Sequence, residues 1–254
     1  MIAGAIGAAI VTLAARRMRA LSTSGMVTGT AAGTIAVAAG WSWGILLVAH
    51  FIAASALSKL GERRKSELVG PITEKGDERD ARQVAANGAV YVLAALGYLL
   101  WHSPLTYAVG IGALAASAAD TWATEIGTLA AKNPVSIISG QRVPPGTSGG
   151  VSLVGMLASV AGTLFIAAGA ALARWPVPFT AIVLGGLAGA VADSLLGATL
   201  QDRRWCDACA MATERSVHSC GNVTRRTGGL RGLDNDAVNA VCSAVGALVT
   251  LLLS

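Results

Sequence analysis

Long apolar stretches alternate with short polar segments along the chain, and most of the stretches are long enough for a bilayer-spanning helix. The first two are short, so one or both could be re-entrant. The pattern predicts an all-α polytopic membrane protein with about seven or eight transmembrane helices, forming a single transmembrane domain over residues 1–254. The helices are expected near residues 2–15, 26–40, 43–59, 83–101, 105–128, 149–173, 178–200 and 235–253.

The composition favours the same class. Hydrophobic residues make up 54% of the chain and charged residues only 13%, whereas a soluble domain carries roughly a quarter charged residues. A soluble helical protein with a very apolar core is the alternative. The net charge of +5 does not indicate nucleic acid as a partner, because the basic residues flank membrane helices and form no stripe with interleaved aromatic residues.

Lysine and arginine residues are concentrated in alternate loops. All but one of the 19 lie in the turn after the first helix or in the loops at about 59–82, 129–148 and 201–234; the exception is Arg174. The positive-inside rule makes these loops cytosolic and puts both ends of the chain outside. We therefore expect an integral protein of a prokaryotic inner membrane whose active site faces the cytosol.

Carboxylates inside the predicted spans are the first candidate site residues, because an acid within a membrane is costly unless it finds partners inside the bundle. Asp120 and Glu125 lie on one broad polar face near the cytosolic end of the fifth helix. Asp193 lies in the seventh helix, in a row of glycines that would let another helix approach closely. These glycines are Gly185, Gly189 and Gly197. A polar clamp between helices is the alternative.

The sequences around two of these acids resemble each other. Ala119-Asp120-Thr121 and Ala192-Asp193-Ser194 each end an outside-to-inside helix. Each is followed by a cytosolic loop, a glycine cluster and a returning helix. This predicts a parallel internal repeat of residues 105–173 and 178–253.

The first glycine cluster is a candidate phosphate site just before a helix. Exposed backbone N–H groups at a helix start suit an anion, although no Gly-Lys-Ser/Thr follows, as a Walker A motif would need. A flexible turn with a capping hydroxyl is the alternative. Neighbouring carboxylates are the ligands that Mg²⁺ prefers when it also binds substrate phosphates. The cluster comprises Gly146, Thr147, Ser148, Gly149, Gly150 and Ser152.

The loop at 59–82 carries seven basic and six acidic residues and runs into the fourth predicted helix. Arg79 and Arg82 are further candidates for binding phosphate, since one guanidinium group can donate two parallel hydrogen bonds to phosphate oxygens. Lys65 is a weaker one. Gln83 and Asn87 share one face of the helix, from which Asn87 could reach a metal or a base. A solvated charged hairpin is the alternative.

Three of the four cysteines and one histidine form a second candidate metal site. Cys206-x-x-Cys209 followed by His218-x-Cys220 has the ligand types and spacing of structural Zn²⁺. Free thiols or a redox-labile pair are the alternative. A disulfide is disfavoured in a cytosolic loop.

Four motifs in order carry a resemblance to a known family. They are residues 51–88 with Ser55, Lys65, Arg79, Gln83-Val84 and Ala86-Asn87-Gly88; Ala119-Asp120-Thr121-Trp122-Ala123-Thr124-Glu125; residues 146–152; and Leu233-Asp234-Asn235-Asp236-x-Val-Asn239. Together they resemble the integral-membrane family of transmembrane protein 19 and plant phytyl-phosphate kinase. The resemblance implies transfer of a phosphoryl group from CTP or another nucleoside triphosphate to an isoprenyl monophosphate, giving the diphosphate.

The residue chemistry and the resemblance together give the expected roles and partners. The partners would be a nucleoside triphosphate (CTP favoured), a lipid phosphate and membrane lipid. A CDP-lipid-forming cytidylyltransferase, which would release pyrophosphate, is one alternative. A transporter of a phosphorylated or cationic solute is the other, although acids near the cytosolic ends of helices argue against it.

Mg²⁺ would be held by Asp120, Glu125, Asp193, Asp234 and Asp236. The triphosphate would be held by residues 146–150, Arg79, Lys65, Arg82 and Gln83. Asn87 would complete the catalytic group of Asp120, Glu125 and Arg79.

Overall fold

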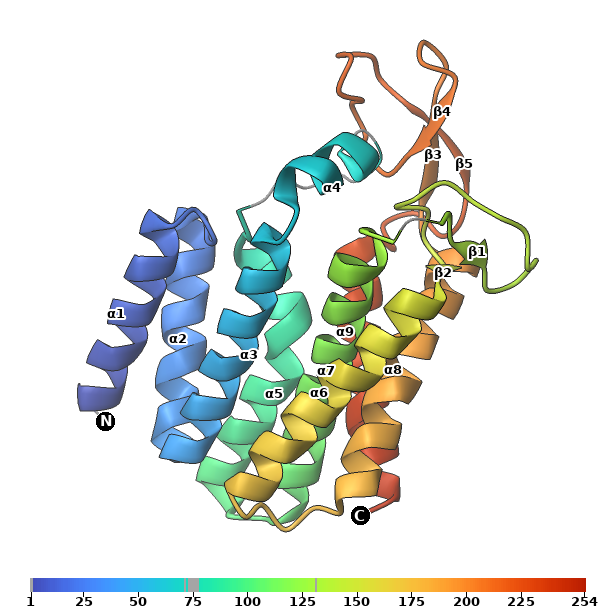
Figure 1. Cartoon of the computed structure of the whole chain (residues 1–254). Helices are drawn as coiled ribbons and strands as arrows, with labels where there is room; N and C mark the ends of the chain where they lie inside the picture. The colour runs from blue at the N-terminus through green and yellow to red at the C-terminus, as the bar shows by residue number, and fades with distance from the viewer. Residues whose placement is uncertain (1, 71, 73–77, 131) are drawn as a thin grey trace.

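The computed structural model describes residues 2–70, 72, 78–130 and 132–254, and these form a helical bundle with two small sheets at one end (Figure 1). The all-α polytopic class is confirmed, and the long helices end within four residues of their predicted limits. Five of them, α3, α5, α7, α8 and α9, are long and apolar enough to cross a membrane. The long helices are α1 (Ile2–Arg17), α2 (Thr23–Ala39), α3 (Trp41–Lys59), α5 (Ala81–Trp101), α6 (Leu105–Gly127), α7 (Leu153–Leu172), α8 (Phe179–Thr199) and α9 (Asn235–Leu252).

The predicted loops contain structure that the apolar pattern did not indicate. The loop at 59–82 forms the short helix α4 (Glu62–Val69); Lys75, also in this loop, lies outside the described residues. Strands β1 (Val135–Ser136) and β2 (Gly150–Val151) pair antiparallel, which makes α7 begin at Leu153 rather than at residue 149. A second sheet has the order β4 (Met211–Thr213), β3 (Arg203–Cys206) and β5 (Arg225–Gly228). Strands this short do not show the alternation of apolar and polar residues from which a strand is predicted.

Close backbone packing of α6, α8 and α9 forms the half of the bundle that holds the site. A Cβ atom at Gly189 of α8 would lie 2.4 Å from the Cβ of Ala116 in α6 and 2.7 Å from the carbonyl oxygen of Cys242 in α9. A Cβ at Gly246 would lie 2.6 Å from the carbonyl oxygen of Gly112. Gly185 and Gly189 therefore face other helices, as the spacing of the row predicted, whereas Gly197 packs against the backbone of Gly149.

The directions of these helices match the predicted repeat. Helices α6 and α8 run toward the sheets, whereas α7 and α9 run away from them (Figure 1). A parallel repeat needs this order of directions; the repeat itself stays a prediction.

Replacing Gly189 by alanine should destabilise the bundle. The added methyl group would meet two helices at once, and overpacking of this kind costs about 1–3 kcal/mol. We expect a lower melting temperature for Gly189→Ala in detergent micelles, read from intrinsic fluorescence. Gly88→Ala in α5 is the matched control, because its Cβ would meet nothing within 4 Å. Equal melting temperatures for the two variants would contradict the close packing at Gly189.

An aromatic cluster fills the end of the bundle opposite the sheets. Trp43 is fully buried, and its ring lies 4.5 Å from that of Trp175 and 5.2 Å from that of Tyr91 (centroid distances). Both ends of the chain lie on this side (Figure 1). Trp43 and Trp175 are buried inside the bundle, whereas Trp41 and Trp101 are exposed at this end.

Candidate functional site

A cavity of about 970 Å³ lies at the end of the bundle that carries the loops. Its lining comes from α6, the glycine loop at 146–150, α7, α8, the segment after α8 and the start of α9. Acidic residues dominate the charged part: among the described lining residues, only Lys132 and Arg204 are basic. The acidic lining residues are Asp120, Glu125, Asp193, Asp202, Glu214, Asp234 and Asp236.

Asp120 and Asp193 face each other across the seam between α6 and α8, with their carboxyl groups within hydrogen-bonding range. Helix α8 can approach this closely because Gly186 packs on Ala115 of α6. Within the described part of the chain, the buried Oδ1 atom of Asp193 has no hydrogen-bond partner. Two adjacent carboxylates with an unsatisfied buried oxygen either share a proton or hold a cation. Their oxygen ligands fit Mg²⁺.

Glu125 has different neighbours from Asp120. Its carboxylate accepts hydrogen bonds from the Ser58 hydroxyl and from the Lys65 ammonium group, the latter at 2.5 Å. Lys65 also donates to the carbonyl oxygen of Leu57 at 2.7 Å. Asp120 and Glu125 are five positions apart in α6, which separates their directions by about 140° around the helix axis. The polar face that the sequence predicted as one is therefore divided between two sets of neighbours. Glu125 joins α3, α4 and α6, and it still lines the cavity.

Arg79 belongs to this same partly buried group. Its guanidinium donates to the Ser58 hydroxyl at 3.2 Å. Burial lowers the pKa of Arg79 below its ordinary value, and the nearby Glu125 carboxylate partly offsets this. The arginine stays protonated. A Cβ at Gly25 would lie 2.1 Å from the carbonyl oxygen of Arg79, so only glycine in α2 allows the Arg79 backbone to pass here.

The glycine loop packs between α4 and α8. Gly146 and Gly149 have φ angles of 81° and 77°, in the left-handed region that favours glycine. A Cβ at Gly149 would lie 2.4 Å from the Cβ of Ala198. Ser152 accepts a hydrogen bond from the backbone N–H of Gly155 at 3.1 Å and so caps α7. Thr147, Gly150 and Ser152 line the cavity together with the rest of the loop.

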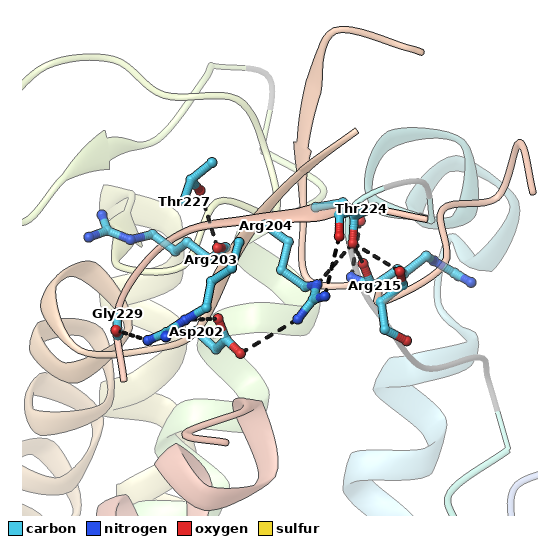
Figure 2. Close-up of polar contacts among 10 residues, drawn as sticks. Asp202, Arg203, Arg204, Arg215, Thr224, Thr227 and Gly229 are labelled. Carbon is cyan, nitrogen blue, oxygen red and sulfur yellow. Dashed lines mark hydrogen bonds and ion pairs between the residues drawn. The ribbon is translucent and has the colours of Figure 1, made fainter. Parts of the chain in front are cut away.

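Glu214 and Arg204 are cavity residues that sequence reasoning missed. Glu214 accepts hydrogen bonds from the Ser148 hydroxyl and the Gln201 side chain, both at 2.7 Å. Arg204 in β3 donates to the Thr224 hydroxyl at 2.9 Å and lies 3.8 Å from the Asp202 carboxylate (Figure 2). These contacts fix the segment after α8 over the cavity. Only the cysteine spacing signalled that this loop is folded.

The acids at the start of α9 are joined to α5 by an arginine. Arg82 donates to Asp234 Oδ2 at 2.7 Å, and its Nε atom lies 3.8 Å from Asp236 Oδ2. Asp234 also caps α9 by accepting from the N–H of Ala237 at 3.0 Å. Both acids line the cavity, and Asp236 is the more buried. Arg82 therefore pairs with two of the predicted metal ligands.

Gln83 and Asn87 have separate surroundings although they share a helix face. Gln83 forms a capping box with Asp80 and lines the cavity. Asn87 donates to the carbonyl oxygen of Gln83 at 3.1 Å and accepts from the Ser117 hydroxyl at 3.1 Å. Ser117 in turn lies 3.2 Å from Nε2 of His50. Asn87 thus links α5, α6 and α3, and it does not itself line the cavity.

The predicted cysteine–histidine cluster is assembled in the sheet above the cavity. The ligand atoms of Cys206, Cys209, His218 and Cys220 lie within 4.8 Å of one another, and the cysteines are free thiols. Hydrogen bonds from Asn222 and then from His218 lower the pKa of the Cys220 thiol to about 6.

The fold and the site define a polytopic integral membrane protein with an acidic cavity at the loop-bearing end of its bundle. Residues 6–247 match the model of the family described as integral membrane protein DUF92, and the chain belongs to that family. The family predicted from the four motifs is thereby confirmed.

Several curated proteins are similar to this chain over most of its length. Protein PGR of Arabidopsis thaliana is 29% identical, covering 94% of this chain and 90% of its own. Protein VTE6, chloroplastic, of the same plant is 27% identical, covering 92% of this chain and 65% of its own. An uncharacterised membrane protein of Methanocaldococcus jannaschii is 29% identical, covering 76% and 79%. No solved structure gives a significant match.

Proposed function

We propose that this protein is a membrane-embedded, Mg²⁺-dependent phosphotransferase. It moves a phosphoryl group from a nucleoside triphosphate, with CTP favoured, to an isoprenyl monophosphate and so forms the diphosphate. One observation carries the proposal: a single cavity is lined by carboxylates and a glycine loop in one part and by apolar residues of α7 and α8 in another.

The apolar part of the cavity suits a lipid chain. Leu157 of α7 and Val191 of α8 line the cavity and are also largely exposed on the outside of the bundle, at 61% and 50%. The cavity therefore opens between these helices toward the position of the lipid. An isoprenyl chain would lie there and present its phosphate to the acidic part. The other large apolar lining residues of the two helices are Leu153, Met156, Val160 and Leu187.

The acidic part needs cations before it can hold phosphates. Seven carboxylates line it beside two basic residues, so a triphosphate would be repelled unless metal ions intervened. Asp120 and Asp193 are the best-placed ligands, because they adjoin and one of their oxygens is unsatisfied. Mg²⁺ bound there would neutralise charge on the transferring phosphoryl group.

The chain's own groups would position the two substrates. Backbone N–H groups of the glycine loop and the side chains of Lys132 and Arg204 would hold the triphosphate. A lipid monophosphate is already anionic near neutral pH, so it attacks the γ-phosphate without a dedicated base, and alignment contributes most of the acceleration. The resemblance to plant phytyl-phosphate kinase supports the isoprenyl class and the nucleotide.

We place the site on the cytosolic face of a prokaryotic inner membrane, and the arrangement of the bundle supports the cytosolic side. The cavity lies at the end that carries the basic loops, which the positive-inside rule assigns to the cytosol. The aromatic cluster around Trp43 fills the opposite end, which argues against a solute path through the bundle.

The test is transfer of label from CTP to phytyl monophosphate by the purified protein in lipid nanodiscs with Mg²⁺. CTP labelled at the γ-phosphate should give labelled phytyl diphosphate on thin-layer plates, and CTP labelled at the α-phosphate should not. Excess EDTA should stop the reaction. Label from the α-phosphate in a lipid product, with release of pyrophosphate, would instead identify a cytidylyltransferase. A panel of nucleotides and isoprenyl phosphates that gave neither product would refute the proposal.

A further inference from the structure

Two tight turns bring four metal-binding side chains together in the three-stranded sheet. Cys206 ends β3 and Cys209 lies in the turn between β3 and β4, where Ala210 is in the left-handed region at φ 49°. A second turn is closed by the bridge between Val217 and Val223 and carries His218 and Cys220. Paired turns of this kind present two ligands each, which is the arrangement that a four-coordinate metal needs.

The distances fit a tetrahedral metal rather than a disulfide. The sulfur atoms of Cys206 and Cys220 are 3.7 Å apart, whereas a disulfide joins its sulfurs at about 2.05 Å. Two thiolates on one tetrahedral zinc lie about 3.8 Å apart, given a Zn–S bond of about 2.3 Å. Nδ1 of His218 lies 3.2 Å from the sulfur of Cys220, so the imidazole already faces the thiolates.

The sheet has too little apolar core to hold its own shape. Within residues 201–226, all of which the structure describes, the buried side chains are Gln201, Cys206, Thr213, His218 and Thr224. None of these is a large apolar residue. Small domains without a core are stabilised by disulfides or by metals, and the cysteines here are free.

We propose that Cys206, Cys209, His218 and Cys220 bind one Zn²⁺ in a closed structural site. Three thiolates and one imidazole at tetrahedral positions are a ligand set that zinc prefers over hard cations such as Mg²⁺. All four positions are filled by protein atoms, so the ion holds the fold together and takes no part in the transfer reaction.

The zinc ion acts on the cavity through the end of β4. Thr213 and Glu214 both donate to the carbonyl oxygen of Ile72, at 3.0 and 2.8 Å. Glu214 accepts from the Ser148 hydroxyl of the glycine loop at 2.7 Å. The ion fixes β4 against β3, and β4 in turn places Glu214 beside the loop. Glu214 is therefore a positioning residue whose location depends on the metal.

Metal content of the purified protein is the first test. Protein expressed with zinc in the medium should contain about one zinc per chain by mass spectrometry, and Co²⁺ in its place should give the visible absorption of tetrahedral thiolate coordination. Cys209→Ser with Cys220→Ser should lower the content below about 0.1 per chain. Cys242→Ala should keep it, because Cys242 lies in α9 away from the sheet. Iron in place of zinc, unchanged zinc in the double variant, or a Cys206–Cys220 disulfide would overturn the proposal.

Limited proteolysis tests the structural role without an activity assay and in the unaltered chain. Trypsin should cut the zinc-loaded protein slowly within the sheet, and release of the metal by a mercurial reagent with a chelator should speed cutting about tenfold or more. Glu214→Gln should keep its zinc and its resistance. Equal cleavage rates before and after metal release would overturn the structural role.

Discussion

Asp120→Asn is expected to lower the rate of phosphoryl transfer by about 10²-fold or more, since removal of one preorganised electrostatic group commonly costs this much. The amide has the size of the carboxylate but cannot supply an anionic ligand to Mg²⁺. Stability should not fall, because the substitution removes one of two like charges that face each other in a buried seam. Activity and folding are thereby separated in one variant.

Initial rates at several Mg²⁺ concentrations, beside a melting curve in detergent, measure both effects. Asp193→Asn should behave in the same way, and the double variant should lose little more than either single one, because residues that share one ion act as a unit. Glu67→Gln is the matched control: it makes the same chemical change on the exposed face of α4. A fully active, folded Asp120→Asn variant would refute the metal role of Asp120.

The sequence predicted the bundle and the central acids for one physical reason. Charge is expensive in hydrocarbon, so both the long apolar runs and the rare acids within them stand out without any knowledge of neighbours. Asp120 and Asp193, 73 positions apart in the chain, were each found in this way. The glycine row of α8 also predicted which face of that helix packs against another helix.

The partners of these groups could not be predicted, because they depend on contacts between distant segments. The pair of Lys65 and Glu125 joins two residues 60 positions apart, and it separates Glu125 from the Asp120 carboxylate. Glu214 reaches Ser148 only because β4 pairs with β3. Strands of two to four residues are too short to show a periodic pattern of apolar residues. The two sheets and the late start of α7 depend on strand pairing, so the sequence pattern could not predict them.

Lys65→Met should lower the free energy of unfolding by about 3 kcal/mol, because removing one partner of a buried ion pair leaves the other charge poorly compensated. The side chains of Lys65 and Glu125 are only 10% and 20% exposed. Ser58 and Arg79 remain beside Glu125 and limit the loss. Chemical unfolding in detergent micelles measures this change in the free energy of unfolding. Arg63→Met on the same helix should change stability by less than about 0.5 kcal/mol, since that arginine is almost fully exposed.

The double variant Lys65→Met with Glu125→Gln separates two roles of Glu125. Removing the carboxylate together with its ammonium partner leaves no buried charge unpaired at that point, so most of the lost stability should return. If Glu125 only joins α4 to α6, this variant should regain activity along with stability. If Glu125 also holds Mg²⁺ or the nucleotide, the variant should be stable and inactive, and higher Mg²⁺ should partly restore its rate. Failure to regain stability would show that the pair itself is not the source of the Lys65→Met defect.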